Sequence, residues 1–312
     1  MLRRDFLQSA LFAAAACATE GRLLAAVEPA AAVPIKDRIC LFTDHLDDFG
    51  YSHADLVKMF APLKIAGPDL TLRGGGVVLP DRVAEELPKV AAAFREAGMS
   101  IPMLSTTLTS AKDVAAKPIL STMGLLGIKY FKLGYYHYHD LAKWESDIES
   151  QREELASLLT LARQHQAHAG LHNHAGAGIG GAVWDAWEML KPLNPADVGF
   201  FFDPSHASIE GPKHTWKLNF QRISPRLSMV AVKDYTWEKT AKGWQTRWCP
   251  LGEGMVNWTE FFQMLAKFPF AGPLSVHIEY NPGGSTRVEQ IDNALAAAQR
   301  DIDFVRKFLP AS

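Results

Sequence analysis

The chain is poor in cysteine, and it lacks both an excess of one charge and a long hydrophobic run. Its three cysteines, Cys17, Cys40 and Cys249, are too few for a disulfide framework, and no CxxC pair suggests a zinc site. Lysine and arginine number 32 against 34 acidic residues, so no basic excess favours nucleic acid as a partner. The longest apolar run is too short to span a bilayer comfortably, so we expect no membrane span.

The fingerprint of dinucleotide-binding folds is also missing. No Gly-x-Gly-x-x-Gly follows the first expected strand, and Gly74-Gly75-Gly76 has no third glycine at the required spacing. We therefore interpret this triplet as a tight turn between a strand and a helix. An open, doubly wound sheet is the structural alternative.

The N-terminal segment has the features of an export signal. Two arginines and a Phe-Leu pair precede a short, small-residue apolar run over residues 10–18, which resembles a twin-arginine signal. We predict that residues 1–33 are this signal and an Ala/Pro-rich linker. Residues 34–312 would then work in the periplasm or otherwise outside the cytoplasm. A lipid anchor on Cys17 and an amphipathic first helix are the alternatives.

From Ile39 onward, short β-rich runs alternate with longer helical patterns. The expected strands are residues 38–44, 69–74, 100–106, 129–135, 168–174, 198–203, 227–233 and 273–279. The helical patterns include residues 80–97, 144–166, 258–268 and 287–308. Eight such units without a break in composition predict an α/β fold, a single-domain (βα)8 TIM barrel.

Polar and apolar side chains alternate at the ends of several expected strands. Because neighbouring side chains on a strand point to opposite faces, Val276 and Ile278 should face helices while His277 and Glu279 point inward. The same alternation directs further ionisable side chains into the barrel, namely Lys132, His172, His174, Asp203 and Lys233. The carboxyl ends of barrel strands form the mouth where βα loops build active sites.

Many of the 11 histidines lie at or just past expected strand ends: His45, His137, His139, His172, His174, His206 and His277. Taken singly, each is explained as a hydrogen-bonded barrel residue, Asp203 as a helix cap, and Lys233-Asp234 as a structural ion pair. Since all of these residues occur at one end of the barrel, we predict an active site there.

Five segments carry a resemblance to a known family: Leu171-His-Asn-His174, Phe201-Phe-Asp-Pro-Ser-His206, Val230-Ala-Val-Lys-Asp234, Leu251-Gly-Glu-Gly254 and His277-Ile-Glu-Tyr280. They resemble the fifth to eighth strands, with the loop after the seventh, of the xylose isomerase-like barrel family. That family contains sugar phosphate isomerases and epimerases, and AP endonucleases are distantly related to it. The likeness covers residues 38 to about 308.

The resemblance implies that Asp203 and Glu279 bind a divalent metal, that Glu279 is also the base, and that His206 contacts the sugar. Two positions depart from the family pattern: His172 matches a glutamate ligand, and Ala231 matches a histidine ligand. We therefore expect His172, Asp203 and Glu279 as metal ligands, with His206 or water completing the shell. Such a donor set suits manganese, zinc, iron or cobalt.

Together these features predict an enzyme that removes a proton α to a carbonyl of an unphosphorylated sugar or keto-sugar. The expected catalytic residues are Glu279, Lys233 and His174, and the expected substrate-binding residues are His206, His277 and Lys132. Isomerisation is what the family implies. A one-base dehydratase or keto-glycoside lyase is an alternative because one of the family's two opposed carboxylates is missing. A degenerate barrel that binds carbohydrate without catalysis is the other.

Overall fold

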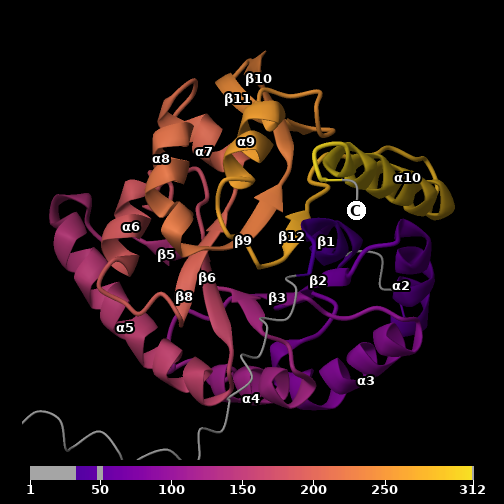
Figure 1. Ribbon diagram of the computed structural model, residues 1–312, viewed down its shortest axis with the longest axis horizontal. Helices are drawn as coiled ribbons and strands as arrows, with labels where there is room; N and C mark the ends of the chain where they lie inside the picture. The colour runs from indigo at the N-terminus through magenta and orange to yellow at the C-terminus, as the bar shows by residue number, and fades with distance from the viewer. Residues whose placement is uncertain (1–32, 48–51, 311–312) are drawn as a thin grey trace, which may run out of the picture. The chain divides into compact units, whose positions relative to one another are not determined.

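The computed structural model describes residues 33–47 and 52–310, which form a closed barrel of eight parallel strands (Figure 1). Their order around the barrel is β1-β12-β9-β8-β6-β4-β3-β2. The strands are β1 (Ile39–Phe42), β2 (Gly67–Leu72), β3 (Met103–Thr106), β4 (Tyr130–Lys132), β6 (His168–His172), β8 (Val198–Phe202), β9 (Leu227–Val232) and β12 (Leu274–Val276). The predicted (βα)8 barrel is thus confirmed, and the doubly wound alternative is wrong. The predicted signal and linker lie outside the described residues, apart from Val33.

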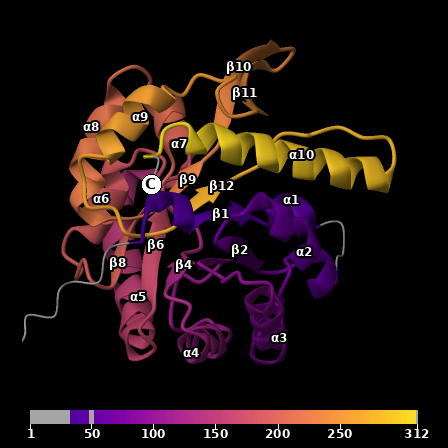
Figure 2. The same ribbon diagram turned by 45° about the vertical axis from the view of Figure 1, so that its right-hand side comes forward.

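Helices alternate with the strands and surround the barrel (Figures 1 and 2). They are α1 (Asp44–Asp47), α2 (His53–Phe60), α3 (Val83–Glu96), α4 (Ala116–Leu126), α5 (Trp144–Gln164), α6 (Trp184–Leu190), α7 (Pro204–Glu210), α8 (Thr215–Ile223), α9 (Trp258–Leu265) and α10 (Arg287–Arg306). A capping box formed by Thr286 and Glu289 fixes the start of α10, which matches the expected helix at residues 287–308. Among the described helices, none combines the length and apolarity needed to cross a bilayer.

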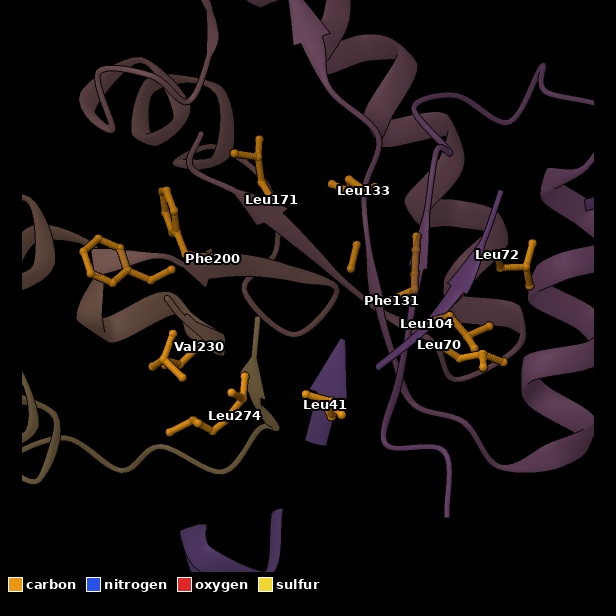
Figure 3. Packing of buried hydrophobic residues seen from close by; sticks show 14 of the residues in the cluster. Leu41, Leu70, Leu72, Leu104, Phe131, Leu133, Leu171, Phe200, Val230 and Leu274 are labelled. Atoms are coloured by element: carbon orange, nitrogen blue, oxygen red, sulfur yellow. The ribbon is translucent and has the colours of Figure 1, made fainter. Parts of the chain in front are cut away.

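The apolar side chains form two layers, as the alternation along the strands predicts. The larger layer lies between strands and helices, where Leu171, Phe200 and Val230 project from neighbouring strands (Figure 3). A smaller group fills the barrel interior and includes Cys40, Met103, Phe201, Met229 and Ala231. Complete burial of one such large side chain stabilises the fold by about 1.5–3 kcal/mol. The polar side chains of the site therefore lie beyond this apolar group, at the carboxyl ends of the strands.

An antiparallel hairpin between β9 and α9 was not predicted. It consists of β10 (Asp234–Thr240) and β11 (Gly243–Cys249), and its turn uses the positive φ of 97° at Gly243. A smaller pair, β5 (Tyr136–His137) and β7 (Gly178–Ile179), joins two loops at the barrel mouth. The cysteines Cys40 and Cys249 are both free and buried, so they do not form a bridge.

Asp234 fixes the base of this hairpin to the loop that precedes α9. The buried carboxylate accepts backbone N–H bonds from residues on both segments and the indole N–H of Trp258 at 2.8 Å. A side chain at Gly254 would place its Cβ 2.0 Å from Asp234 Oδ1, so this position requires glycine. Lys233 and Asp234 do not form the structural ion pair that is the alternative interpretation of their sequence, since Lys233 pairs with Asp203 and Glu279.

Candidate active site

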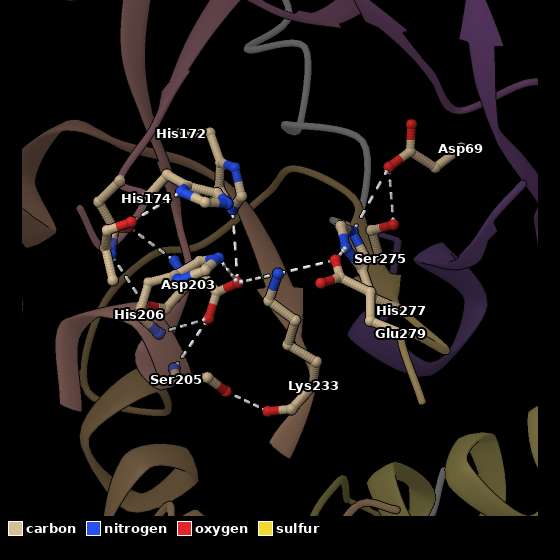
Figure 4. A network of polar contacts seen from close by, with 12 residues as sticks. Asp69, His172, His174, Asp203, Ser205, His206, Lys233, Ser275, His277 and Glu279 are labelled. Atoms are coloured by element: carbon tan, nitrogen blue, oxygen red, sulfur yellow. Dashed lines mark hydrogen bonds and ion pairs between the residues drawn. The ribbon is translucent and has the colours of Figure 1, made fainter. Parts of the chain in front are cut away.

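The carboxyl ends of four neighbouring strands bring the predicted polar residues to one place at the barrel mouth (Figure 4). His172 ends β6, Asp203 follows β8, Lys233 follows β9, and Glu279 lies just past β12. His206 joins them from α7. The side chains of the first three and of His206 are nearly inaccessible, whereas that of Glu279 is 25% exposed and reaches toward solvent.

Asp203 caps a helix, which is one of the two roles that the sequence left open, and it also presents an oxygen to the cluster. Its Oδ1 caps α7 by accepting the backbone N–H groups of Ser205 and His206 at 2.8 and 3.1 Å. Its Oδ2 is left for side chains and lies 3.4 Å from His172 Nε2, 3.8 Å from His206 Nε2 and 3.5 Å from Lys233 Nζ. The cap therefore orients a buried carboxylate oxygen toward the centre of the cluster.

Lys233 links this carboxylate to a second one. Its Nζ donates to Glu279 Oε1 at 2.7 Å, and His277 Nδ1 lies 3.3 Å from the same oxygen. Burial alone would raise the pKa of Glu279, but Lys233 and His277 outweigh it and hold the pKa far below its ordinary value. The carboxylate is accordingly ionised and fixed beside a cation.

Asp69 extends this network into the barrel, and sequence reasoning missed it. It is fully buried on β2 and accepts the hydroxyls of Ser105 and Ser275, each at 2.8 Å, while His277 Nε2 lies 3.8 Å from its Oδ2. Burial raises the pKa of Asp69 despite the opposing effect of His277 and the two hydroxyls. The inward parity of an acidic residue on an apolar strand was the available signal.

Within the part of the chain that the structure describes, one group of side chains has the composition and spacing of a metal site. His172, Asp203 and His206 each offer a ligand atom, and these atoms lie within 4.8 Å of one another. Burial, followed by the charge of Lys233, holds the pKa of both histidines well below normal, so their rings are neutral and able to coordinate. His172 Nδ1 and both nitrogens of His206 make no hydrogen bond to any described residue.

This group differs in one member from the predicted set. His172 and Asp203 come together as expected, but the third member is His206, because the Glu279 carboxylate turns to Lys233 and His277. Glu279 as a metal ligand stays a prediction. Two imidazoles and a carboxylate suit zinc, iron, cobalt or manganese, so the residues present fit a divalent ion.

The remaining predicted residues are distributed unevenly. His174 packs on His206 with ring centroids 3.9 Å apart, at the exposed side of the cluster. Lys132 lies beside the cluster on β4, where its Nζ donates to Leu133 O at 2.9 Å and lies 4.0 Å from the Tyr135 ring. Burial lowers the pKa of Lys132 to about 8. The structure therefore places His174 against the cluster, whereas the ammonium of Lys132 contacts groups beside the cluster.

Three other histidines from strand ends behave differently. His137, at the end of β5, and His139, just beyond it, are both exposed, and His139 approaches Asp147, so neither joins the cluster. His45 lines the same cavity as Glu279 and His174, and burial lowers its pKa to about 4. That cavity has a volume of about 910 Å³, and Glu279 and His174 are the members of the polar cluster that line it.

Comparison with known proteins agrees with this architecture. A xylose isomerase-like TIM barrel protein from Mycobacterium smegmatis, in complex with magnesium, is 15% identical with a TM-score of 0.62, over 87% of this chain and 96% of its own. A probable 3-DHS dehydratase from Bacillus anthracis is 15% identical with a TM-score of 0.66, over 86% and 98%. The 3-keto-D-glucoside 4-epimerase YcjR from E. coli is 12% identical with a TM-score of 0.64, over 86% and 99%.

At such low identity these structures show a shared fold. No curated protein matches the chain in sequence. The sequence profile described as "Xylose isomerase-like TIM barrel", however, matches residues 78–308, which is most of the chain. The closed barrel, the polar cluster at its mouth and this match together place the chain in the xylose isomerase-like TIM barrel family.

Proposed function

We propose that the chain is an exported sugar isomerase or epimerase-like enzyme. It removes a proton α to a carbonyl of an unphosphorylated sugar or keto-sugar. The observation that carries this proposal is the ion pair of Glu279 and Lys233, 2.7 Å long, at the edge of an open cavity in the barrel mouth. The pair provides a base that is ionised in the resting site and a fixed cation for the oxygen that becomes negative.

The reaction begins when the substrate carbonyl oxygen draws the ammonium of Lys233 toward itself. This weakens the ion pair that lowers the pKa of Glu279, so the carboxylate becomes a stronger base. The bond between the α carbon and its hydrogen breaks, and the proton passes to Glu279. The released electron pair forms a carbon–carbon double bond, and the carbonyl electrons move to the oxygen held by Lys233. The hydroxyl proton on the α carbon then passes to the former carbonyl oxygen, and Glu279 returns its proton to the former carbonyl carbon. A carbonyl re-forms on the α carbon, which completes an isomerisation.

A divalent ion held by His172, Asp203 and His206 would supply Lewis acidity that polarises the substrate oxygen. The protein groups around these residues support such a site. Asn173 exchanges two hydrogen bonds with the backbone of Asp203, at 2.8 and 2.9 Å, and thereby fixes the strand end that carries the carboxylate. His277 holds the Glu279 carboxylate on the other side of Lys233 (Figure 4).

A one-base elimination is the second candidate. It is favoured because the other carboxylate that lines the cavity is already ion-paired. That carboxylate belongs to Asp44, which is ion-paired with Arg73. His174 and His206 lie across Lys233 from Glu279 (Figure 4). In an elimination, Glu279 takes the α proton, and the electrons of that carbon–hydrogen bond form a double bond between the α and β carbons as the carbon–oxygen bond at the β carbon breaks. The leaving oxygen departs with the bonding electrons and receives the proton from Glu279.

The proposal can be tested with the purified chain, expressed with its own N-terminus and assayed in deuterated water. Methyl 3-keto-glucoside and common ketohexoses serve as test substrates, chosen for their likeness to what YcjR is named for. We expect deuterium to enter the α position, faster with added Mn²⁺, and elemental analysis to find about one transition metal ion per chain. Isomer formation supports the first candidate, and loss of the aglycone or of water supports the second. Carbohydrate binding without exchange would identify a non-catalytic barrel.

A further inference from the structure

A second cavity of about 850 Å³ opens beside the catalytic one, between the β10–β11 hairpin and α10. The two cavities share Trp248, Glu279 and Tyr280 in their walls. A molecule whose reacting part meets Glu279 can therefore extend into the second cavity without leaving the protein. Each cavity by itself has a volume typical of a small-molecule site, about 300–1,000 Å³.

Trp248 stands between the two cavities and is fixed from the catalytic side. Its indole ring contacts the ring of His206 edge-on at a centroid distance of 5.3 Å, and Lys233 Nζ lies 4.4 Å from it. The ring is half-buried on β11. A flat aromatic surface held in this way provides a stacking platform for the apolar face of a sugar ring.

Tyr280 forms another part of the shared wall, and hydrogen bonds hold its side chain in place. Its hydroxyl donates to Asp301 Oδ2 at 2.9 Å and accepts from Arg300 Nη2 at 2.6 Å. Arg300 also lies 3.9 Å from Glu253, so the cation is balanced within the wall. Rigid donors and acceptors of this kind reduce the ordering cost of binding a hydroxyl-rich ligand.

The charges in the lining indicate which ligand fits. Its two arginines are each balanced by a carboxylate: Arg247 lies 3.8 Å from Glu238, and Arg300 lies 3.9 Å from Glu253. Glu279, which also lines the cavity, is paired with Lys233. The remaining polar lining consists of threonine and asparagine side chains. Phosphate or carboxylate groups would meet no net positive charge, whereas a neutral polyol would meet both donors and acceptors.

We propose that the second cavity binds a second, neutral sugar unit, so that the substrate is a disaccharide or a glycoside with a sugar aglycone. The reacting sugar then lies at Glu279, and its neighbour lies between the hairpin and α10. This proposal rests on the proposed function for the identity of the reacting sugar, but the cavity can be tested separately by binding.

Ala296 offers a direct test because it is an exposed alanine of α10 that lines the second cavity. Ala296→Trp fills part of that space from α10, in a cavity whose lining includes neither Lys233 nor the three residues of the metal-like group. Ala84→Trp, at an exposed alanine of α3, is the matched control. The test substrates are methyl 3-keto-glucoside and 3-keto-cellobiose oxidised in its non-reducing ring, which differ in whether a methyl group or a glucose follows the reacting ring.

We expect the unaltered chain to have a kcat/KM at least about tenfold higher for the two-ring substrate. Ala296→Trp should lower that value about tenfold or more and leave the value for the methyl glycoside within about twofold. The Ala84→Trp control should change neither. Equal kcat/KM for both substrates in the unaltered chain, or an equal loss on both in Ala296→Trp at unchanged melting temperature, would overturn the proposal.

Two additions keep the test decisive. If Ala296→Trp lowers the melting temperature, Asn293→Leu removes a polar group from the same wall at nearly constant volume and should show the same selectivity. If neither keto-sugar is turned over, calorimetry with cellobiose and glucose replaces kinetics. Preferential binding of cellobiose that Ala296→Trp abolishes supports the second cavity even though the proposed chemistry has failed. Equal binding of cellobiose and glucose, or no binding of either, contradicts it.

Discussion

Lys233 is the residue on which the two halves of the site depend, since its ammonium lies 3.5 Å from Asp203 and 2.7 Å from Glu279. An inward lysine at the end of an apolar strand must have an anionic partner to remain charged in a buried place. Here it has two. Without the ammonium, both carboxylates would face each other across the site with no cation between them.

We predict that Lys233→Met lowers turnover about a hundredfold to a thousandfold, because the developing oxyanion loses its cation. The melting temperature should also fall, since Asp203 is left buried with less compensation. Steady-state kinetics and thermal unfolding measure the two effects. Lys129→Met, at an exposed lysine, is the control and should change neither. Turnover in the Lys233 variant equal to that of the control would remove Lys233 from the mechanism.

Asp69 acts through His277 and is a positioning residue. Asp69→Asn keeps the size of the side chain and its contacts with Ser105 and Ser275, but it removes the negative charge 3.8 Å from His277 Nε2. We predict that kcat falls about tenfold while KM stays within about twofold, because the ring that holds Glu279 is less firmly oriented. A rise in KM at constant kcat would instead place Asp69 in substrate binding.

At the scale of elements, the β10–β11 hairpin depends on Asp234, which accepts bonds from the backbone of the following loop and from Trp258. We predict that Asp234→Ala lowers the free energy of unfolding by about 3 kcal/mol, because several buried N–H groups lose their acceptor. Asp234→Asn retains one oxygen and should cost less. Denaturant unfolding followed by tryptophan fluorescence measures both. Equal stability of the alanine variant and the unaltered chain would contradict this account.

Some secondary-structure elements could be predicted from the sequence, and others could not. The eight barrel strands were predictable because each is a short, almost wholly buried segment with apolar residues at alternate positions, and helices separate them. The hairpin was not, because the stretch from Glu238 to Arg247 is largely exposed and has no apolar alternation. Its strands are stabilised by pairing with each other and by contacts at their base, which a local pattern does not reveal.

The site itself was predictable only in part. Inward parity brought His172, Asp203, Lys233 and Glu279 to one mouth, because parity depends only on strand register. Parity does not determine which of the neighbouring side chains an acidic side chain contacts. Thus Glu279 faces Lys233, and His206 takes the third place in the metal-like group. Their catalytic, binding and metal-ligand roles stay predictions until they are measured.

At the scale of the whole molecule, the barrel separates an apolar interior from a polar mouth. The interior group around Phe201, Met229 and Ala231 closes the barrel beneath the cluster, so solvent and substrate approach from the mouth alone. The ionisable residues of the site are then concentrated where water can be displaced by a ligand. Export of the chain stays a prediction from its N-terminal sequence and would give this mouth access to extracytoplasmic sugars.

Glu279 is proposed to remove the α proton, and this role can be measured by deuterium exchange in Glu279→Gln. The substitution preserves volume and hydrogen-bonding shape but removes the base, whereas His277→Gln on the same segment keeps it. The account predicts that the Glu279 variant exchanges the α hydrogen of methyl 3-keto-glucoside about a hundredfold to ten-thousandfold more slowly than the unaltered chain. Its melting temperature should fall only slightly, because Lys233 loses one anionic partner but keeps Asp203 as the other. Exchange at nearly the original rate would show that the chemistry rests on another residue.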